Sequence, residues 1–550
     1  MISPTEESLR KRISKERSLE MVKYGRTKIY DKVITFLHGD KRTAFSLINH
    51  ALAIIDDSID TTTNTKQLDK AKEILNKSFN DKKILVEQDW EKDIFRLGQT
   101  LLKLQKEGFV YAIDVFHEII NYWNIENRNL NRKGKILNSS DLDKLNLEIG
   151  KSIGIQFLYF LCPESDKKVI SSIASIYGFS IKLADNLSDL KEDLEKGYIN
   201  ISEENIKKHK IKLTILSEKD LRPYITKEFE RVKKYYKKGD EKVEKIINQS
   251  PSFKKGLLIF KDIAHSWFKQ VSEYSFIIAL KQYDISNYRT PKFISKKEIL
   301  KMEKLYGIKL SKIITLSYEQ EARNTHLVKK KNLLYNPYSH KKINRANNKI
   351  KMMIADYPEI KNVLDLGCDD GSRTLELFNG KKLFGIEFVT ESVKKAEEKG
   401  IEVYFGDITK EVYKDKKFDL VSLLGEMVNF VGLEVDTLLS NALKQVKENG
   451  YFLLSCMHTK FDKHQEGNYV VWSFKDFSKK KWLIKGEKIP RTFFLISKRR
   501  LLERIKNIAK LQNCKLVLKK EDSINNYYED MPLGLYFFKK LLPPSQNSSF

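Results

Sequence analysis

Two clusters of aspartates in the first half of the chain have the spacing of a metal site. Asp56 and Asp60 end one apolar run, and Asp185, Asp189 and Asp193 follow another. Residues four apart share a helix face, so each cluster forms a line of carboxylates. Facing lines of like charge repel unless cations lie between them, and Mg²⁺, which shares oxygens with phosphates, suits such a gap. The spacing therefore predicts a Mg²⁺ site; the alternative is two solvated helix faces.

A glycine-containing turn in the second half of the chain has the pattern of a nucleotide site. The segment from Asp365 to Gly371 follows an apolar strand-like run, and its glycines lack the Cβ that would obstruct a ligand. The next two predicted strands each end in an acid. Acids at consecutive strand ends place a ligand at the carboxyl edge of a parallel sheet.

The elements that carry the aspartates are helical. Apolar residues recur at spacings of three and four from about residue 15 to 285, with few Gly or Pro and no alternating strands. We expect an all-α bundle over 15–285. Its clearest helices are predicted at Leu97–Lys106, Val110–Trp123, Leu142–Leu161, Val169–Lys196 and Phe253–Gln282.

The glycine-containing turn belongs to a different pattern, in which short apolar strands alternate with amphipathic helices. This alternation predicts an α/β domain over 335–542 with a mostly parallel sheet and helices on both faces. A basic helical linker is expected over 286–334. The strands are predicted at Val363–Leu366, Lys382–Ile386, Glu402–Phe405, Leu420–Leu424 and Tyr451–Ser455.

Composition limits the classes of partner. The 550 residues include 101 Lys and Arg against 74 Asp and Glu, a formal charge of +27. Such an excess suits nucleic acid, an anionic membrane surface or phosphorylated substrates. The lysines are spread along the chain without a nucleic-acid-binding motif, so we expect no nucleic-acid partner, and nothing requires an obligate protein partner. Without a signal peptide, a long apolar span or a zinc-type cysteine spacing, we expect a cytoplasmic protein, with peripheral membrane contact left open.

The two acidic segments resemble the two signatures of the squalene and phytoene synthase family. The first runs from Leu37 to Asp60 and the second from Ala184 to Asp193, followed by Lys196–Ile201. The resemblance implies an all-α isoprenoid-synthase fold with a deep apolar cavity. In that fold Asp56, Asp60, Asp189 and Asp193 would hold Mg²⁺ ions that bridge a prenyl diphosphate, neutralising the leaving group as the carbon–oxygen bond ionises.

The chain departs from this family where the diphosphate would be clamped. Ala53 and Tyr198 stand where the family carries arginine, whereas Arg42 keeps the family's spacing to the aspartates. Lys182 shares a helix face with the second acidic cluster. Lys151 lies in a segment that resembles the Lys-Thr segment of linear polyprenyl diphosphate synthases. Both are predicted to bind diphosphate as point charges, and the alternative for each is a salt bridge to the acidic line.

The second half resembles the class I S-adenosylmethionine-dependent methyltransferases. The turn at Gly367 is similar to their first motif and would contact the methionine part of the cofactor. The alternative is a nicotinamide-binding domain, whose GxGxxG pattern is not satisfied here. The resemblance implies that the cofactor is bound by Asp365, Gly367, Asp369, Gly371, Glu387, Asp407 and Ile408. Glu387 would bind the ribose hydroxyls, and Asp407 the adenine amino group. The methyl acceptor would lie after the fourth and fifth strands, near Glu426, Asn429 and His458. Each of these is either a base or orienting group or a structural residue, and His458 is alternatively an exposed loop histidine.

Together these features predict a bifunctional isoprenoid enzyme. The helical domain would ionise or transfer a prenyl diphosphate with Mg²⁺, and the second domain would methylate a prenyl-derived lipid or small molecule with S-adenosylmethionine. A methyltransferase whose helical domain only binds and presents a prenyl diphosphate or lipid is the alternative. The missing arginines favour the alternative, and the retained aspartates favour catalysis.

Overall fold

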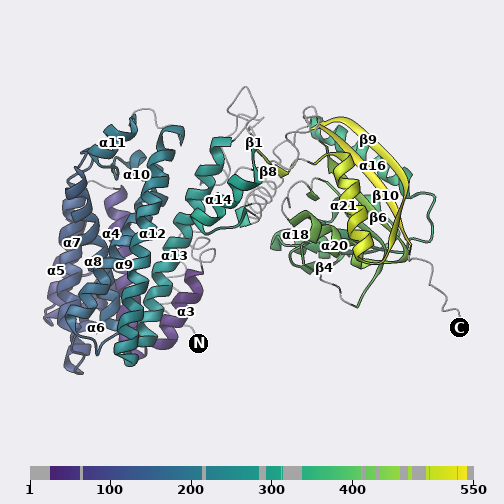
Figure 1. Cartoon of the computed structure of the whole chain (residues 1–550). Coiled ribbons are helices and arrows are strands. Elements are labelled where there is room, and N and C mark those ends of the chain that lie inside the picture. Colours follow the sequence, from purple (N-terminus) through teal and green to yellow (C-terminus); the bar gives the residue numbers. More distant parts are fainter. Residues whose placement is uncertain are drawn as a thin grey trace. The chain divides into compact units, whose positions relative to one another are not determined.

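The computed structural model divides into two units, Met1–Ala279 and Leu280–Phe550, each with its own contacts. It describes residues 25–61, 66–213, 218–283, 293–310, 312–313, 337–410, 413, 415–425, 427–428, 434–458, 469–472, 491–494, 496–528 and 531–541. Figure 1 shows the elements of both units. No helix among the described residues combines the length and apolarity needed to cross a bilayer.

In its described part the first unit is entirely helical, as the 3–4 spacing of apolar residues predicts. Its helices are α3 (Arg26–Phe36), α4 (Gly39–Thr61), α5 (Lys66–Phe79), α6 (Asp89–Lys106), α7 (Ala112–Leu130), α8 (Ser139–Leu161), α9 (Lys167–Ser188), α10 (Leu190–Lys196), α11 (Glu203–His209), α12 (Glu218–Gln249) and α13 (Lys254–Leu280), with a 3₁₀ turn η1 (Pro251–Phe253).

Helices α8 and α9 lie side by side in the bundle and pack closely, because glycines meet where they cross (Figure 1). A methyl group added at Gly150 would lie 2.0 Å from the backbone oxygen of Gly178, and one at Gly178 would lie 2.1 Å from that of Gly150. Lysines 151 and 182, predicted to bind diphosphate, are on these two helices.

The helix predicted at Val169–Lys196 is two helices. Helix α9 ends at Ser188 and α10 begins at Leu190, with Asp189 between them at φ −99° and ψ 9°. The amides of Asp189 and Asp193 still donate to the backbone oxygens four residues earlier. The aspartate line therefore bends at Asp189, which the spacing of residues alone does not reveal.

The second unit alternates strands and helices. It begins with η2 (Lys281–Tyr283), at the end of the segment predicted as the bundle. The next elements, β1 (Phe293–Ile294) and α14 (Lys296–Tyr306), lie in the segment predicted as a linker. The remaining elements are α16 (Pro337–Ile354), β2 (Asn362–Leu366), α17 (Ser372–Leu377), β3 (Lys382–Glu387), α18 (Thr390–Glu398), β4 (Glu402–Phe405), β5 (Phe418–Leu423), α20 (Val435–Gln445), β6 (Val446–Met457), β7 (Tyr469–Trp472), β8 (Arg491–Phe494), α21 (Lys498–Leu511), β9 (Lys515–Tyr528) and β10 (Met531–Leu541).

Seven of these strands form one mixed sheet in the order β4-β3-β2-β5-β6-β10-β9. Strands β2 to β6 are parallel, and β10 runs antiparallel to both β6 and β9. The chain proceeds outward from β2 to β4 and then returns to the other side of β2. Open α/β sheets bind ligands at such a reversal, in the crevice outside the carboxyl ends of the two strands on either side of it, which here are β2 and β5.

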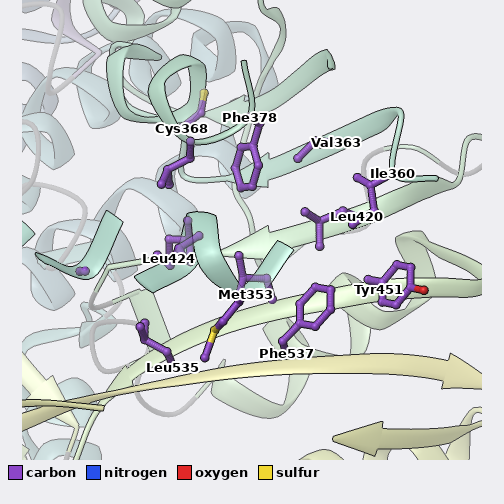
Figure 2. Close-up of a cluster of buried hydrophobic side chains, with 14 of the residues drawn as sticks. Met353, Ile360, Val363, Cys368, Phe378, Leu420, Leu424, Tyr451, Leu535 and Phe537 are labelled. Atoms are coloured by element: carbon purple, nitrogen blue, oxygen red, sulfur yellow. The ribbon is translucent and has the colours of Figure 1, made fainter. Parts of the chain in front are cut away.

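Helices cover both faces of the sheet. On one face Met353 of α16 packs with Leu453 of β6 and Phe537 of β10 in a buried cluster that Figure 2 shows in part. Lys540, on the other face by strand alternation, donates to the backbone oxygen of Leu443 in α20. The predicted α/β architecture with helices on both faces is thus confirmed.

The five predicted strands are present as β2 to β6, with ends that shift by up to five residues. The antiparallel hairpin of β9 and β10, which completes the sheet, was not predicted from the sequence. Strand β9 is an edge strand that is mostly polar after Leu518, with three Lys and two Asn among its 14 residues, so the apolar pattern on which strand prediction depends is short. The smaller sheet of β1, β7 and β8 was also missed.

Candidate functional site

The turn after β2 is built on backbone conformations that favour glycine. Gly367 and Gly371 have φ of +80° and +73°, and Asp369 between them has φ of +49°. A methyl group added at Gly371 would lie 2.5 Å from Ile401 Cδ1. The amides of Gly367 and Cys368 both donate to the backbone oxygen of Ile386, which ties the turn to β3. Among L side chains, aspartate is one of the few that tolerates the conformation at residue 369.

Glu387, the last residue of β3, binds the backbone of this turn through its carboxylate. Its Oε2 accepts from the Asp369 amide at 3.0 Å, and its Oε1 accepts from the Phe388 and Val389 amides at 2.8 and 2.9 Å. Burial raises the pKa of Glu387, and the three amides oppose that shift. Since a carboxylate oxygen accepts about two hydrogen bonds, Oε2 keeps one acceptor position for a ligand hydroxyl.

Asp365 is buried beneath the turn. Its two carboxylate oxygens accept from Thr374 Oγ1 at 2.5 Å and from Ser422 Oγ at 2.6 Å, which joins β2 to α17 and β5. Burial raises the pKa of this carboxyl, and the two hydroxyls work against the shift. Asp365 thus holds the elements of the crevice together, and its hydroxyl partners were not singled out in the sequence.

The residues predicted to meet the adenine lie just after β4. Asp407 is exposed and accepts from the amide and the hydroxyl of Thr409 at 2.8 and 2.7 Å, both through Oδ1. Ile408 is buried next to it. Glu387, Asp369 and Asp407 therefore lie at the ends or turns of neighbouring parallel strands, as predicted. Their roles toward a ligand stay predictions.

Of the three residues predicted near the methyl acceptor, Glu426 and Asn429 lie outside the described residues. His458 is buried at the end of β6, so it is not an exposed loop histidine. Its Nδ1 lies 3.3 Å from the backbone oxygen of Ile496, and its Nε2 lies 2.5 Å from Tyr536 Oη. Because a carbonyl only accepts, Nδ1 carries the proton and Nε2 accepts from Tyr536. Burial lowers the pKa of His458 and favours this neutral form.

In the helical unit, one carboxylate of the second acidic cluster, that of Asp185, is paired with a lysine of the protein. Lys182 Nζ lies 2.9 Å from Asp185 Oδ2. Burial acts to lower the pKa of Lys182, but Asp185, Asp193 and Glu126 outweigh it and raise the pKa above its ordinary value. The salt-bridge alternative therefore describes Lys182 in this structure.

Asp193 has a second set of partners that the sequence did not indicate. Its Oδ2 accepts from Asn200 Nδ2 at 2.6 Å, and Asn200 Oδ1 accepts from Arg132 Nη2. Arg132 is buried, and its guanidinium lies 5.8 Å from the ring centroid of Tyr198. A guanidinium is thus present near the second acidic segment, although it comes from the end of α7, more than sixty residues earlier in the chain.

The first acidic cluster is less fully described. Asp56 and Asp60 are in α4, but their side chains lie outside the described residues. Arg42, at the start of α4, donates through Nε to the backbone oxygen of Leu37 at 3.0 Å, and Lys151 is half-buried on α8. Within the described part of the chain, no three His, Cys, Asp or Glu side chains are grouped to hold a metal ion. The predicted Mg²⁺ site stays a prediction.

Part of the second unit is similar to known methyltransferases. Residues 359–493 match a family model described as a methyltransferase domain. One similar solved structure is a Pyrococcus horikoshii protein, with 20% sequence identity, coverage of 36% of this chain and 90% of that chain, and a TM-score of 0.27. Another is an S-adenosylmethionine-dependent methyltransferase of Clostridium acetobutylicum, with 17% identity, coverage of 38% of this chain and 99% of that chain, and a TM-score of 0.28. A third is the N-methyltransferase NodS of Bradyrhizobium japonicum in complex with S-adenosyl-L-homocysteine, with 13% identity, coverage of 38% of this chain and 90% of that chain, and a TM-score of 0.27. Among curated proteins, none matches the chain.

The family match lies wholly within the second unit and does not extend into the helical one. It includes the turn at Gly367 and the carboxylate of Glu387, which were selected from the sequence by their spacing. The chain therefore carries a methyltransferase domain at residues 359–493.

Proposed function

We propose that this protein is an S-adenosylmethionine-dependent methyltransferase whose helical unit binds an isoprenoid diphosphate or a related lipid. One observation carries the methyltransferase assignment: two glycines at positive φ and the buried Glu387 carboxylate meet at the crevice where the strand order reverses. The family match at 359–493 supports it.

The residues present fit this cofactor. The backbone around Gly367 and Gly371 would hold the methionine part, the remaining acceptor position of Glu387 would bind a ribose hydroxyl, and Asp407 with Ile408 would bind the adenine. When bound, the cofactor supplies an already activated methyl group on a sulfonium. The protein then contributes mainly proximity and in-line orientation.

The residues predicted near the methyl acceptor are the candidates for taking a proton from it. Nδ1 of His458 donates to Ile496 and Nε2 accepts from Tyr536, so neither nitrogen is free to take a proton from an acceptor, and burial favours the neutral imidazole. Glu426 and Asn429 are the more direct candidates for a base and an orienting group. An acceptor that is already nucleophilic needs none of these.

For the helical unit we propose Mg²⁺-dependent binding of a prenyl diphosphate by Asp56, Asp60, Asp189 and Asp193, with ionisation of its carbon–oxygen bond. The alternative is a unit that binds and presents the isoprenoid without ionising it. The Lys182–Asp185 ion pair favours this alternative, because it satisfies one carboxylate of the line without a metal.

Binding of S-adenosyl-L-homocysteine, measured by isothermal titration calorimetry, tests the methyltransferase assignment. We expect the wild-type protein to bind it and Glu387→Ala to bind about 10-fold more weakly or worse, since hydrogen bonds to a charged group contribute about 1.5–3 kcal/mol. Glu391→Ala, an exposed residue of α18, is the matched control and should bind normally. A wild-type protein that does not bind the ligand would refute the assignment.

Release of inorganic diphosphate tests the helical unit. The protein is incubated with Mg²⁺ and farnesyl or geranylgeranyl diphosphate, without methyl donor. Release that is lost in Asp60→Ala would support ionisation. Binding of the prenyl diphosphate without release would support the presenting alternative, and neither binding nor release would refute both proposals for this unit.

A further inference from the structure

Arg373 carries a hydrogen-bond donor that nothing in the described structure accepts from. It is the second residue of α17, two positions after Gly371, and is half-buried. Its Nε donates to Asn347 Oδ1 at 3.0 Å, whereas its Nη2 is buried and has no hydrogen-bond partner among the described residues. A buried unsatisfied donor costs about 1–3 kcal/mol, and more on a charged group, so its presence needs an explanation.

The guanidinium lies at the crevice between β2 and β5. Its Nη1 is 3.8 Å from the position that a Cβ of Gly425 would occupy, and Gly425 follows β5. Among the described residues no other atom comes within 4 Å of that position. Ser455 Oγ donates to the backbone oxygen of Gly425 at 2.8 Å, which fixes this loop. Nη1 of Arg373 therefore lies beside the loop that follows β5, at the point where the strand order reverses, and Nη2 is buried next to it.

Neighbouring residues hold Arg373 in place before any ligand arrives. Asn347 is almost fully buried in α16, and its Nδ2 donates to Glu376 Oε2 at 3.1 Å. Lys351 Nζ donates to the other oxygen of Glu376 at 2.9 Å. Because Asn347 accepts from Nε, the guanidinium is held in one orientation while its Nη2 donor has no partner among the described residues. Carboxylates and phosphates are the groups that a guanidinium binds through such donors.

We infer that Arg373 binds an oxygen-acid group of the ligand in this crevice, a carboxylate or a phosphate. The inference rests on the proposed function, in which two sources supply that chemistry: the carboxylate of the methionine part of the cofactor, and an anionic group of the methyl acceptor. Arg373 is then a positioning residue that fixes one end of a bound molecule while Glu387 fixes another.

The two sources are separated by ligands that differ only in the anion. Binding of S-adenosyl-L-homocysteine is compared with that of 5′-methylthioadenosine, which keeps the nucleoside and thioether but lacks the amino acid. Inorganic diphosphate serves as the probe for an acceptor phosphate. All three are titrated calorimetrically into the wild-type full chain, Arg373→Met, Arg373→Lys and the control Arg499→Met, which removes an exposed arginine of α21 that pairs with Glu503.

If the anion is the cofactor carboxylate, Arg373→Met weakens S-adenosyl-L-homocysteine about 10- to 100-fold and leaves 5′-methylthioadenosine unchanged. Arg373→Lys, which keeps the charge but not the paired donors, gives a smaller loss. If the anion belongs to the acceptor, Arg373→Met leaves both nucleosides unchanged and weakens diphosphate binding relative to Arg499→Met.

The inference is overturned if Arg373→Met leaves all three affinities unchanged, or if it weakens the two nucleosides equally, which would indicate a general distortion of the turn. Since the methionine removes a buried unsatisfied donor, we expect the thermal midpoint to fall little, and this measurement detects misfolding. Failure of the wild-type protein to bind either nucleoside would refute the proposed function instead, and the diphosphate comparison would still test Arg373.

Discussion

Replacement of Gly371 by alanine tests whether the turn after β2 requires glycine for two separate reasons. At φ +73° any L side chain costs about 1–2 kcal/mol. The added methyl would also lie 2.5 Å from Ile401 Cδ1 and 3.0 Å from Ala396 Cβ, and such overpacking costs about 1–3 kcal/mol. We therefore expect Gly371→Ala to lose about 2–5 kcal/mol of local stability.

Gly400→Ala is the matched control, because Gly400 has φ +83° but nothing within 4 Å of its added methyl. It should cost only the backbone part, about 1–2 kcal/mol. Hydrogen exchange of peptides from β2 and β3, followed by mass spectrometry, measures the free energy of local opening in each variant. Titration with S-adenosyl-L-homocysteine measures the effect on the site.

Ile401 supplies the atom that the methyl group of Gly371→Ala would crowd, so its substitution gives a second test. Ile401→Val removes the Cδ1 atom that the new methyl would meet and costs about 0.5–1.5 kcal/mol by itself. In the Gly371→Ala background it should cost less than that or restore stability. Equal losses in Gly371→Ala and Gly400→Ala, or additive losses in the double variant, would refute the reasoning.

Three further predictions concern packing, pairing and pH. Gly150→Ala should destabilise the helical unit by about 2–4 kcal/mol in thermal unfolding, because the new methyl meets the backbone oxygen of Gly178, which no rotamer change relieves. Lys182→Met should cost about 1–3 kcal/mol by leaving Asp185 unpaired, and adding Asp185→Asn should recover part of that loss. Burial raises the pKa of Glu387, so the folded protein keeps that proton over a pH range where the unfolded chain has lost it. The free energy of unfolding should therefore fall as pH rises from the ordinary glutamate pKa to the folded value, and Glu387→Gln should remove this slope in denaturant titrations at several pH values.

The general plan of both units follows from the sequence, because periodicity is a local property. Apolar residues at spacings of three and four predict the helical bundle, and short apolar runs between helices predict β2 to β6. The residues at the crevice were also predicted, since glycine at positive φ and acids at strand ends follow from the chain's local pattern. The hairpin of β9 and β10 escaped prediction because its edge strand is mostly polar and because it joins the sheet through the pairing of β10 with the distant strand β6.

Which side chains meet is decided by tertiary structure alone. Packing alone brings Arg132 next to Asn200, which in turn binds Asp193. It also places Tyr536 within hydrogen-bond distance of His458. The same packing leaves Arg373 with a donor that has no acceptor among the described residues. Such contacts join residues up to 78 positions apart, so spacing does not report them. The sequence thus determined the two kinds of domain and the positions of their motifs. The tertiary structure decided how each carboxylate, cation and imidazole is satisfied, because burial and partners set the charge state and availability of those groups.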